Sequence, residues 1–520
     1  MSTGTPPARP RSAPHQRLLD RAHHMAPSPP SGNTLTDLEA GFSLHEVVER
    51  RGLPLASVIG IRSFYDQLER MARVCDGTAC HFHGGEVLHA KLSGMGPVGG
   101  VRCLGHCHSA PAFRSGDNVY ACPSRLTVEA WVDEWGEGPS PMVDVEPAPC
   151  VLLAPEAIAL RHVTGARRPD AFADYNLPGA EAITAAIQGA GLRGRVRTGV
   201  LAAEQWPVAR ETAADTRYVV ANGDEGDPGA YIDRVLLEEA SHSILAGMIA
   251  CGRAIGARQG YVFIRGEYPL APQRMRAAIE QARARGVLGI GFDVEVITGA
   301  GSYVSGDANA LLRSIEGLRG EPAPEPPSAA ERGLWGKPTV VHDVETFSLI
   351  PWVVREQRAS KTKTVCISGA LARPCVAEIA LGMGLREVLM RAGGGPRAGS
   401  TWRMALVGGP TGRVLPAAAF DTALTDDTLP GLGHGGIVVL DESVSPRALA
   451  EHLFAFAAAE SCGACAPCRA GTAVLHQMRD RVQLERLLLT ITEGSLCGFG
   501  QRLARPITDL LSAYGDEVLR

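Results

Sequence analysis

The chain has 520 residues, 45% hydrophobic and 21% charged, and its 51 Lys and Arg against 56 Asp and Glu give a net charge of −5. A single hydrophobic core stops growing at about 250–300 residues, so roughly three or four domains are expected. The charge balance offers no polycationic surface, and no apolar run reaches the ~18 residues of a membrane helix, so neither nucleic-acid binding nor a membrane span is predicted.

Residues 1–42 are rich in proline and arginine and lack an apolar signal segment, so they are predicted to be a disordered tail of a cytoplasmic protein. The stretch "LHEVVERRGLPLASVIGIRSFYDQLERMARV", from Leu44 to Val74, has apolar residues at helical intervals around a Gly-Leu-Pro turn, which predicts a small helical bundle. The glycine-rich stretch that follows contains "GGVRCLGHC" and "NVYACP", which favour short strands. Residues 43–148 are therefore predicted to form a helical segment and a small α+β domain.

Residues 149–360 alternate between strand-like and helical patterns. Strand-like runs begin at Tyr218, Gly260 and Phe292, and a long helical stretch, "RVLLEEASHSILAGMIACGRAIG", begins at Arg234. Such alternation is typical of a mainly parallel sheet covered by helices. This segment is therefore predicted to be an α/β domain.

Residues 361–443 are compact and strand-rich, and residues 444–520 are predicted to be a helical bundle. Ser445 and Pro446 form a strong helix start, a hydroxyl cap before a proline at the first helical position. Two apolar stripes then follow at helical spacing: Leu449, Leu453 and Phe456, and afterwards Val474, Met478 and Val482. The whole chain is thus expected to be a multidomain α/β protein.

Four of the 13 cysteines lie near the C-terminus. Cys462, Cys465 and Cys468 form a C-x2-C-x2-C run within "ESCGACAPCRAGT", and Cys497 in "GSLCGFGQ" is the only cysteine downstream. A close trio with one remote cysteine suits a [4Fe-4S] cluster, in which each iron takes one thiolate. Tetrahedral zinc is the alternative, but zinc sites usually pair two short C-x2-C knuckles. The spacing therefore favours the [4Fe-4S] cluster.

A second set of four cysteines lies in the N-terminal half. Cys75 and Cys80 form C-x4-C, and Cys103 and Cys107 form C-x3-C, so each pair is predicted to hold one iron of a [2Fe-2S] cluster, with zinc as the alternative. Four histidines flank these cysteines and have the chemistry of ligands, although loop histidines beside thiols are more often bystanders: His81, His83, His106 and His108. The other cysteines are expected to be small core residues: Cys122, Cys150, Cys251, Cys366 and Cys375.

These motifs resemble a known family. The C-terminal cysteine motifs are similar to the iron-sulfur signature of the NADH-binding flavoprotein subunit of respiratory complex I, and "VCDGTACH" with "RCLGHC" resembles its thioredoxin-like [2Fe-2S] partner. The motifs "GLRGR", "NGDEGDPGAYIDR", "VGGPTG" and "GLGHGGIVVLDE" follow in the family's order. The two units share one chain in the diaphorase subunits of soluble NAD-linked formate dehydrogenases and NAD-reducing hydrogenases.

The resemblance implies a fold and an activity. It implies a thioredoxin-like [2Fe-2S] domain, a Rossmann-like FMN/NADH domain, a ubiquitin-like β-grasp domain over residues 361–443 and a helical [4Fe-4S] bundle. In this family hydride passes between NADH and FMN, and electrons then pass singly to the [4Fe-4S] cluster. It implies Glu225 as a catalytic residue, and the following as residues that bind FMN or NAD(H): Gly194, Arg195, Gly199, Asn222, Asp224, Glu225, Tyr303 and Gly306.

The implied partners are other iron-sulfur subunits and a catalytic subunit, either a molybdenum or tungsten formate dehydrogenase or a nickel-iron hydrogenase. The chain departs from the family at its flavin loop, "GLRGRVRTGVLAAEQW", where Val196 and Arg197 replace glycines and Gln205 replaces a lysine. His342 and Asp343 also replace two asparagines. Two hypotheses follow: an active diaphorase subunit, with Arg197 as a substitute phosphate partner, or a flavin-free electron relay or assembly subunit whose FMN/NADH pocket has decayed.

Overall fold

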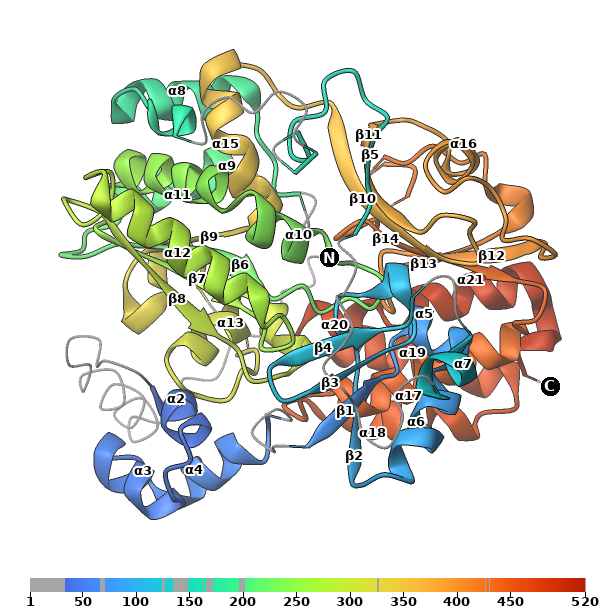
Figure 1. Ribbon diagram of the computed structural model, residues 1–520. Coiled ribbons are helices and arrows are strands. Elements are labelled where there is room, and N and C mark those ends of the chain that lie inside the picture. The colour runs from blue at the N-terminus through green and yellow to red at the C-terminus, as the bar shows by residue number, and fades with distance from the viewer. Residues whose placement is uncertain are drawn as a thin grey trace, which may run out of the picture.

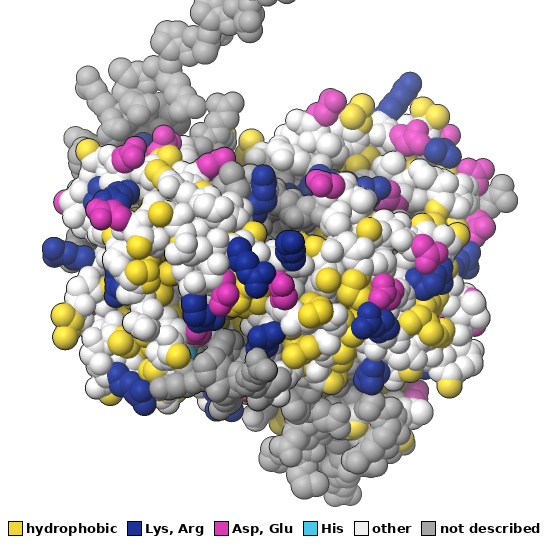
Figure 2. All heavy atoms as spheres, turned by 90° about the horizontal axis from the view of Figure 1, so that it is seen from above, with side chains coloured by type: hydrophobic (Ala, Val, Ile, Leu, Met, Phe, Trp, Pro, Cys, Tyr) yellow, Lys and Arg dark blue, Asp and Glu magenta, His cyan; other side chains and the backbone are white. Residues whose placement is uncertain are grey.

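The computed structural model describes residues 33–65, 71–123, 127–133, 148–161, 163–164, 172–195, 202–324, 327–425, 427–429 and 431–519. Its strands form three separate sheets, and helices surround them (Figure 1). Figure 2 shows Lys and Arg interspersed with Asp and Glu over the face seen from above, with no continuous field of one sign.

Three short helices precede the first sheet: α2 (Thr34–Glu39), α3 (Leu44–Arg51) and α4 (Leu55–Arg62). Asn33 caps α2, so the expected tail of residues 1–42 is wrong for this segment; residues 1–32 lie outside the described part of the chain. Helix α3 ends at Gly52, which has a φ of 64° that favours glycine, as the Gly-Leu-Pro turn predicts. The helical prediction is wrong at its end, where Ala72–Cys75 forms strand β1.

The first sheet has the strand order β2-β1-β3-β4, in which β1 pairs parallel with β2 and antiparallel with β3. Trp131 lies fully buried against it, and the rings of Phe113 and Tyr120 stack at 4.8 Å. The elements of this domain are α5 (Thr78–Cys80), α6 (Glu86–Ser93), β2 (Val98–Val101), β3 (Ala112–Ser115), β4 (Asn118–Ala121) and α7 (Val128–Asp133). The predicted small α+β domain is present.

The second sheet is the predicted parallel one, with the order β8-β7-β6-β9. Its strands are β6 (Tyr218–Gly223), β7 (Gln259–Ile264), β8 (Asp293–Thr298) and β9 (Thr339–Asp343). Its main helices are α8 (Ala180–Ala190), α9 (Ala202–Glu211), α10 (Ile232–Glu239), α11 (Ser241–Ile255), α12 (Leu270–Ala284), α13 (Ala308–Ile315) and α15 (Val344–Glu356). The strand order reverses between β6 and β9, and ligands of open α/β sheets bind at the carboxyl ends of the strands at such a point.

The third sheet is mixed, with the order β13-β12-β14-β10-β11-β5. Its bounds are β5 (Cys150–Leu152), β10 (Thr362–Gly369), β11 (Cys375–Ala380), β12 (Trp402–Val407), β13 (Arg413–Pro416) and β14 (Gly436–Asp441), and α16 (Leu385–Arg391) packs on it. Strand β5 was expected in the preceding α/β domain, but it pairs with β11, so residues 150–152 belong to this sheet.

The C-terminal residues form the predicted helical bundle: α17 (Pro446–Glu460), α18 (Ala466–Val474), α19 (Arg481–Gly494), α20 (Gly498–Arg502) and α21 (Ala504–Tyr514). Ser445 caps α17 through a 3.0 Å bond from the Ala448 N–H, which confirms the predicted start. The second apolar stripe is wrong, because α18 ends at Val474 and Val482 lies on a different helix, where it is 54% exposed. No single helix among the described residues is long and apolar enough to cross a membrane; α10 with α11 reaches that length but is bent by 93°.

Candidate functional site

The four C-terminal cysteines lie at the ends of three helices of the bundle. Cys462 lies in the loop after α17, Cys465 immediately precedes α18, Cys468 lies in its first turn, and Cys497 immediately precedes α20. Burial raises the pKa of Cys468 to about 11; the hydroxyl of Ser461, 3.3 Å from its sulfur, opposes this shift, and the charges of the other three cysteines add to it. Four mutually repelling thiolates are stable together only when cations bind them.

This sulfur set suits a polynuclear cluster better than a single ion. Tetrahedral zinc with Zn–S bonds of about 2.3 Å requires sulfurs roughly 3.8 Å apart. Sulfurs that each bind a different iron lie farther apart, and the trio-plus-one spacing of these cysteines favours that arrangement.

The N-terminal cysteines lie in contacting pairs, all four buried. The sulfurs of Cys103 and Cys107 are 3.6 Å apart, and the thiol of Cys75 contacts those of Cys80 and Cys103, contacts that raise the Cys75 pKa well above its ordinary value together with burial. Two of these contacts, Cys75 with Cys80 and Cys103 with Cys107, lie within the pairs that the sequence assigns to one iron each, and the contact of Cys75 with Cys103 joins the two pairs. They fit a [2Fe-2S] cluster by donor chemistry and pairing.

Two of the flanking histidines make other contacts. His83 Nδ1 lies 2.8 Å from the Ala79 carbonyl oxygen, and the ring of His81 stacks on that of His452 at 4.5 Å. His106 is buried, and its Nδ1 has no hydrogen-bond partner. None of these contacts is with a cysteine, which supports four cysteines as the ligand set.

The predicted flavin residues gather at the point where the order of the parallel sheet reverses. Asn222, at the carboxyl end of β6, accepts a 3.0 Å bond from the Asp224 N–H and donates a 3.0 Å bond to the Gly306 carbonyl. Beside the carboxyl end of β9, the Arg195 N–H donates to Asp343 at 3.2 Å and to Thr346 at 2.9 Å. Gly199, Val196 and Arg197 lie outside the described residues.

The side chain of Arg195 does not project freely into this site. Its guanidinium donates to the Thr362 carbonyl and lies 3.8 Å from Glu345. Lys363 completes the group: its ammonium lies 2.6 Å from Glu345 and 3.1 Å from the Arg195 carbonyl. The Arg195 side chain thus joins the parallel-sheet domain to the third sheet, and its backbone N–H binds the residues at the end of β9 and the start of α15.

Glu225 is fully engaged by its own domain. One carboxylate oxygen accepts the N–H of Ile232 at 2.7 Å, and the other accepts the N–H groups of Asp233 and Arg234 and the hydroxyl of Tyr268 at 3.0, 3.3 and 3.2 Å. Glu225 is 0% exposed. It therefore caps the N-terminus of α10, and this geometry gives it a structural role; its catalytic role remains a prediction.

Asp224, next to Glu225, has a carboxylate oxygen whose hydrogen-bonding capacity is unused. Its Oδ2 is buried and has no hydrogen-bond partner, and burial raises its pKa to about 7 although Arg265 opposes the shift. A buried carboxyl oxygen without a partner is costly unless a ligand group satisfies it. The ribityl hydroxyls of a flavin nucleotide would supply such a donor, so the described residues fit FMN.

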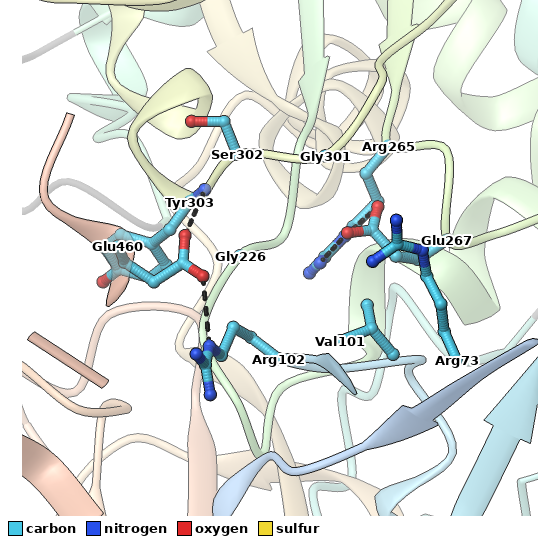
Figure 3. Close-up of a pocket in the computed structure, with 10 residues that line it drawn as sticks. All are labelled: Arg73, Val101, Arg102, Gly226, Arg265, Glu267, Gly301, Ser302, Tyr303 and Glu460. Atoms are coloured by element: carbon cyan, nitrogen blue, oxygen red, sulfur yellow. Dashed lines mark hydrogen bonds and ion pairs between the residues drawn. The ribbon is translucent and has the colours of Figure 1, made fainter. Parts of the chain in front are cut away.

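Tyr303, in the 3-10 helix η5 (Tyr303–Gly306), is held through its backbone and through its ring. Its backbone N–H donates to Glu460 at 3.1 Å, and Glu460 also accepts from Arg102 at 3.3 Å (Figure 3). Its ring makes a T-shaped contact with Phe456 at 5.1 Å and a tilted contact with Phe499 at 5.3 Å. Because Phe499 follows Cys497 by two residues, one aromatic group connects the predicted flavin site with the [4Fe-4S] cysteines.

A small cavity of about 20 Å³ lies beside Tyr303. Gly226, Arg265 and Gly301 line it from the carboxyl ends of the parallel strands, and Arg73 and Arg102 close it from the N-terminal domain (Figure 3). Arg265 is already paired with Glu267 at 2.8 Å. A volume of this size holds one ordered water molecule rather than a nucleotide.

The sequence analysis missed four residues of this region: Arg102, Asp227, His434 and Glu460. Asp227 lies inside the quoted motif "NGDEGDPGAY" and His434 inside "GLGHGG". The hydroxyl of Tyr303 donates to Asp227 at 2.6 Å, and His434 Nδ1 lies 2.9 Å from the other Asp227 oxygen. His434 and Asp227 are 207 positions apart in the sequence, so no spacing rule connects them and only the fold brings them together.

Comparisons with known proteins agree with this geometry. Residues 187–352 match the family of the Nuo51 FMN-binding domain, residues 363–440 match the SLBB domain, and residues 448–520 match the NADH-ubiquinone oxidoreductase-F iron-sulfur binding region. These matches confirm the resemblance drawn from the sequence motifs.

Two similar curated proteins are subunits of redox complexes. The chain is 36% identical to the NADP-reducing hydrogenase subunit HndC of Solidesulfovibrio fructosivorans over 363 residues, which cover 64% of this chain and 74% of that protein. It is 33% identical to an F-type subunit of the NADH-quinone oxidoreductase of Rhizobium meliloti over 391 residues, which cover 69% and 90%. Among solved structures, a chain of the H2-reduced NAD+-reducing [NiFe]-hydrogenase matches with a TM-score of 0.82 and 29% identity, covering 96% of this chain and 91% of that one.

Proposed function

The chain belongs to the family that contains the F-type subunits of NADH-quinone oxidoreductases and the hydrogenase subunit HndC, and from this membership we propose that it is the NADH-oxidising, electron-transferring subunit of a multi-subunit NAD-linked oxidoreductase. The observation that carries the proposal is the continuity of the site. Tyr303 lies at the predicted flavin position, and its ring contacts Phe499, the second residue of the helix that follows the predicted [4Fe-4S] ligand Cys497.

Different residues of the chain would bind FMN and the [4Fe-4S] cluster. Asn222, Asp224 and Gly306 form the polar wall that would hold FMN at the carboxyl end of β6. A bound FMN would supply the conversion between the two-electron chemistry of a nicotinamide and the one-electron chemistry of an iron-sulfur cluster. The four C-terminal cysteines would hold the [4Fe-4S] cluster, and the rings of Tyr303, Phe456 and Phe499 exclude water from the space between.

The N-terminal domain adds a second redox site. The paired contacts of Cys75 with Cys80 and of Cys103 with Cys107 support a [2Fe-2S] cluster. Arg102 directly precedes Cys103 and pairs with Glu460, two residues before Cys462. This ion pair fixes the N-terminal domain against the [4Fe-4S] bundle, as electron exchange between the two domains requires.

The partners follow from the relatives. The similar proteins include subunits of an NADP-reducing hydrogenase and of NADH-quinone oxidoreductases, so this chain functions beside other iron-sulfur subunits. A nickel-iron hydrogenase or a formate dehydrogenase catalytic subunit is the proposed source or destination of the electrons. The similarity to the NAD+-reducing [NiFe]-hydrogenase over 96% of the chain supports the hydrogenase.

The alternative, a flavin-free relay, rests on the altered loop at Val196 and Arg197. The match to the FMN-binding domain extends through that loop, over residues 187–352, and favours the flavoprotein.

Anaerobic purification followed by measurement of acid-released flavin, iron and acid-labile sulfide per chain tests the proposal. One FMN per chain with both clusters, and NADH oxidation with an artificial acceptor, is the expected result. Clusters without flavin, even after FMN is supplied, would establish the relay.

A further inference from the structure

Three polar side chains in contact join two domains beside the flavin site. His434, in the loop before β14, lies 2.9 Å from Asp227, and Asp227 accepts a 2.6 Å bond from the hydroxyl of Tyr303. Asp227, the middle residue of the three, is tightly packed against Gly409: a Cβ atom at that glycine would lie only 2.7 Å from the Asp227 side chain. The side chains of His434 and Asp227 are only 14% and 12% exposed. The third sheet therefore contributes a residue to the site of the parallel-sheet domain.

The charges around His434 favour its protonated form. Burial alone would lower its pKa, but the hydrogen bond and charge of Asp227, with the charges of Glu225 and Asp343, raise that pKa above its ordinary value. Burial would likewise raise the pKa of Asp227, yet His434, Tyr303 and Arg502 hold it below its ordinary value. Asp224 lies within the field of the same histidine. The surroundings of His434 thus favour its protonated form beside the acidic residues of the flavin site.

We propose that His434 is a positioning residue of the flavin site: its protonated ring fixes Asp227, Asp227 fixes the hydroxyl of Tyr303, and FMN binding weakens when His434 loses its proton. The inference rests on the proposed function, because it places Tyr303 beside FMN. The physical basis is that a charge-assisted bond holds its partner more firmly than a neutral one. If Asp227 releases the hydroxyl of Tyr303, the Tyr303 ring can move and its contacts with Phe456 and Phe499 weaken.

The test compares FMN affinity of the flavin-stripped chain at pH 7 and pH 9, measured by quenching of flavin fluorescence. With a second pKa near 6, the FMN phosphate is about 90% or more doubly ionised at pH 7 and above, so its charge changes little. In the unmodified chain the dissociation constant should rise about ten-fold, which corresponds to ~1.4 kcal/mol. His434→Asn keeps a nitrogen donor but takes no proton, so only the smaller pH dependence that comes from Asp224, whose pKa burial raises to about 7, should remain in this variant. His89→Asn, on an exposed face of α6, is the matched control and should behave as the unmodified chain.

Tyr303→Phe tests the far end of the same chain of contacts. It keeps the ring and its packing but removes the hydroxyl, so it should also remove the pH dependence that comes from His434 while leaving His434 in place. A thermal-unfolding series reports on folding: His434→Asn should lower the Tm most below the ordinary histidine pKa, and the difference should vanish as pH rises through the raised pKa.

The outcomes separate the two proposals. If FMN binds and its affinity has the same pH dependence in His434→Asn or Tyr303→Phe as in the unmodified chain, His434 does not position the site. If His434→Asn does not fold, the pH dependence of Tyr303→Phe alone decides the question. If no form of the chain binds FMN at either pH, the proposed function fails and this inference fails with it.

Discussion

The substitution Glu225→Gln tests whether Glu225 is a helix-capping residue or a catalytic residue. Its two oxygens accept four hydrogen bonds, from the N–H groups of Ile232, Asp233 and Arg234 and from the hydroxyl of Tyr268. Glutamine has one oxygen, so in its best orientation it turns its amide toward the Ile232 N–H, which then loses its acceptor. A lost bond to a charged group and an unsatisfied buried donor together cost about 3 kcal/mol.

That cost is measurable as a shift in unfolding. For a domain of roughly 150–250 residues, 1 kcal/mol lowers the Tm by about 2–4 °C, so the FMN-binding domain should melt about 6–12 °C lower in Glu225→Gln. Differential scanning calorimetry on the whole chain resolves this, since its domains need not unfold together. A variant that melts within about 2 °C of the unmodified chain but oxidises no NADH would refute the capping argument and establish Glu225 as catalytic.

Asp224→Asn is the matched control, because the two carboxyls are adjacent and both buried. Burial raises the pKa of Asp224 to about 7, so the fold disfavours its ionised form and stability is lost as pH rises from the ordinary aspartate pKa toward 7. Asparagine removes this loss. The variant should therefore melt no lower than the unmodified chain at pH 5 and higher at pH 8, the opposite sign to Glu225→Gln.

Three further experiments test the cluster ligands and the contacts between domains. Cys497→Ser should remove or convert the C-terminal cluster and leave the N-terminal one, as iron and sulfide content and EPR spectra will show; unchanged spectra would exclude it as a ligand. Lys363→Met strands the buried carboxylate of Glu345, 2.6 Å away, and should cost about 3 kcal/mol, measured by urea unfolding, with recovery when Glu345→Gln is added. Arg102→Gln and Glu460→Gln should show a coupling of about 0.5–1 kcal/mol in a double-mutant cycle scored by proteolytic release of the N-terminal domain; purely additive effects would contradict the ion pair.

Local chemistry made much of the fold predictable. The start of α17 follows from a hydroxyl cap and a proline, and the parallel sheet follows from strands that alternate with helices. Predictions from local sequence pattern were wrong where contacts with distant segments determine the secondary structure. Ala72–Cys75 continues a helical periodicity yet forms β1, because β2 and β3 pair with it on both sides. Strand β5 is separated by about 220 residues from the strand that it pairs with, so no local rule assigns it to its sheet.

The site shows the same division. The cysteines were predictable because cluster ligands have fixed spacings within one or two loops. Glu225 stands in a motif typical of a cofactor site, but the sequence does not show that the next helix begins where its carboxylate lies. His434 was missed because its role depends on the packing of one domain against another, and a lone histidine in a glycine-rich loop has no spacing to mark it.

The altered flavin loop is attached at both ends to an intact frame. Before it, the Arg195 N–H is bound by Asp343 and Thr346; after it, the Ala202 N–H donates to the Leu192 carbonyl at 2.8 Å. Asp343, one of the residues that departs from the family, forms one of the anchors itself and caps α15. Two of the substituted residues thus belong to the frame of the site: Asp343 binds the Arg195 N–H, and His342, whose pKa burial lowers to about 4, accepts a 2.9 Å bond from the Trp206 indole N–H.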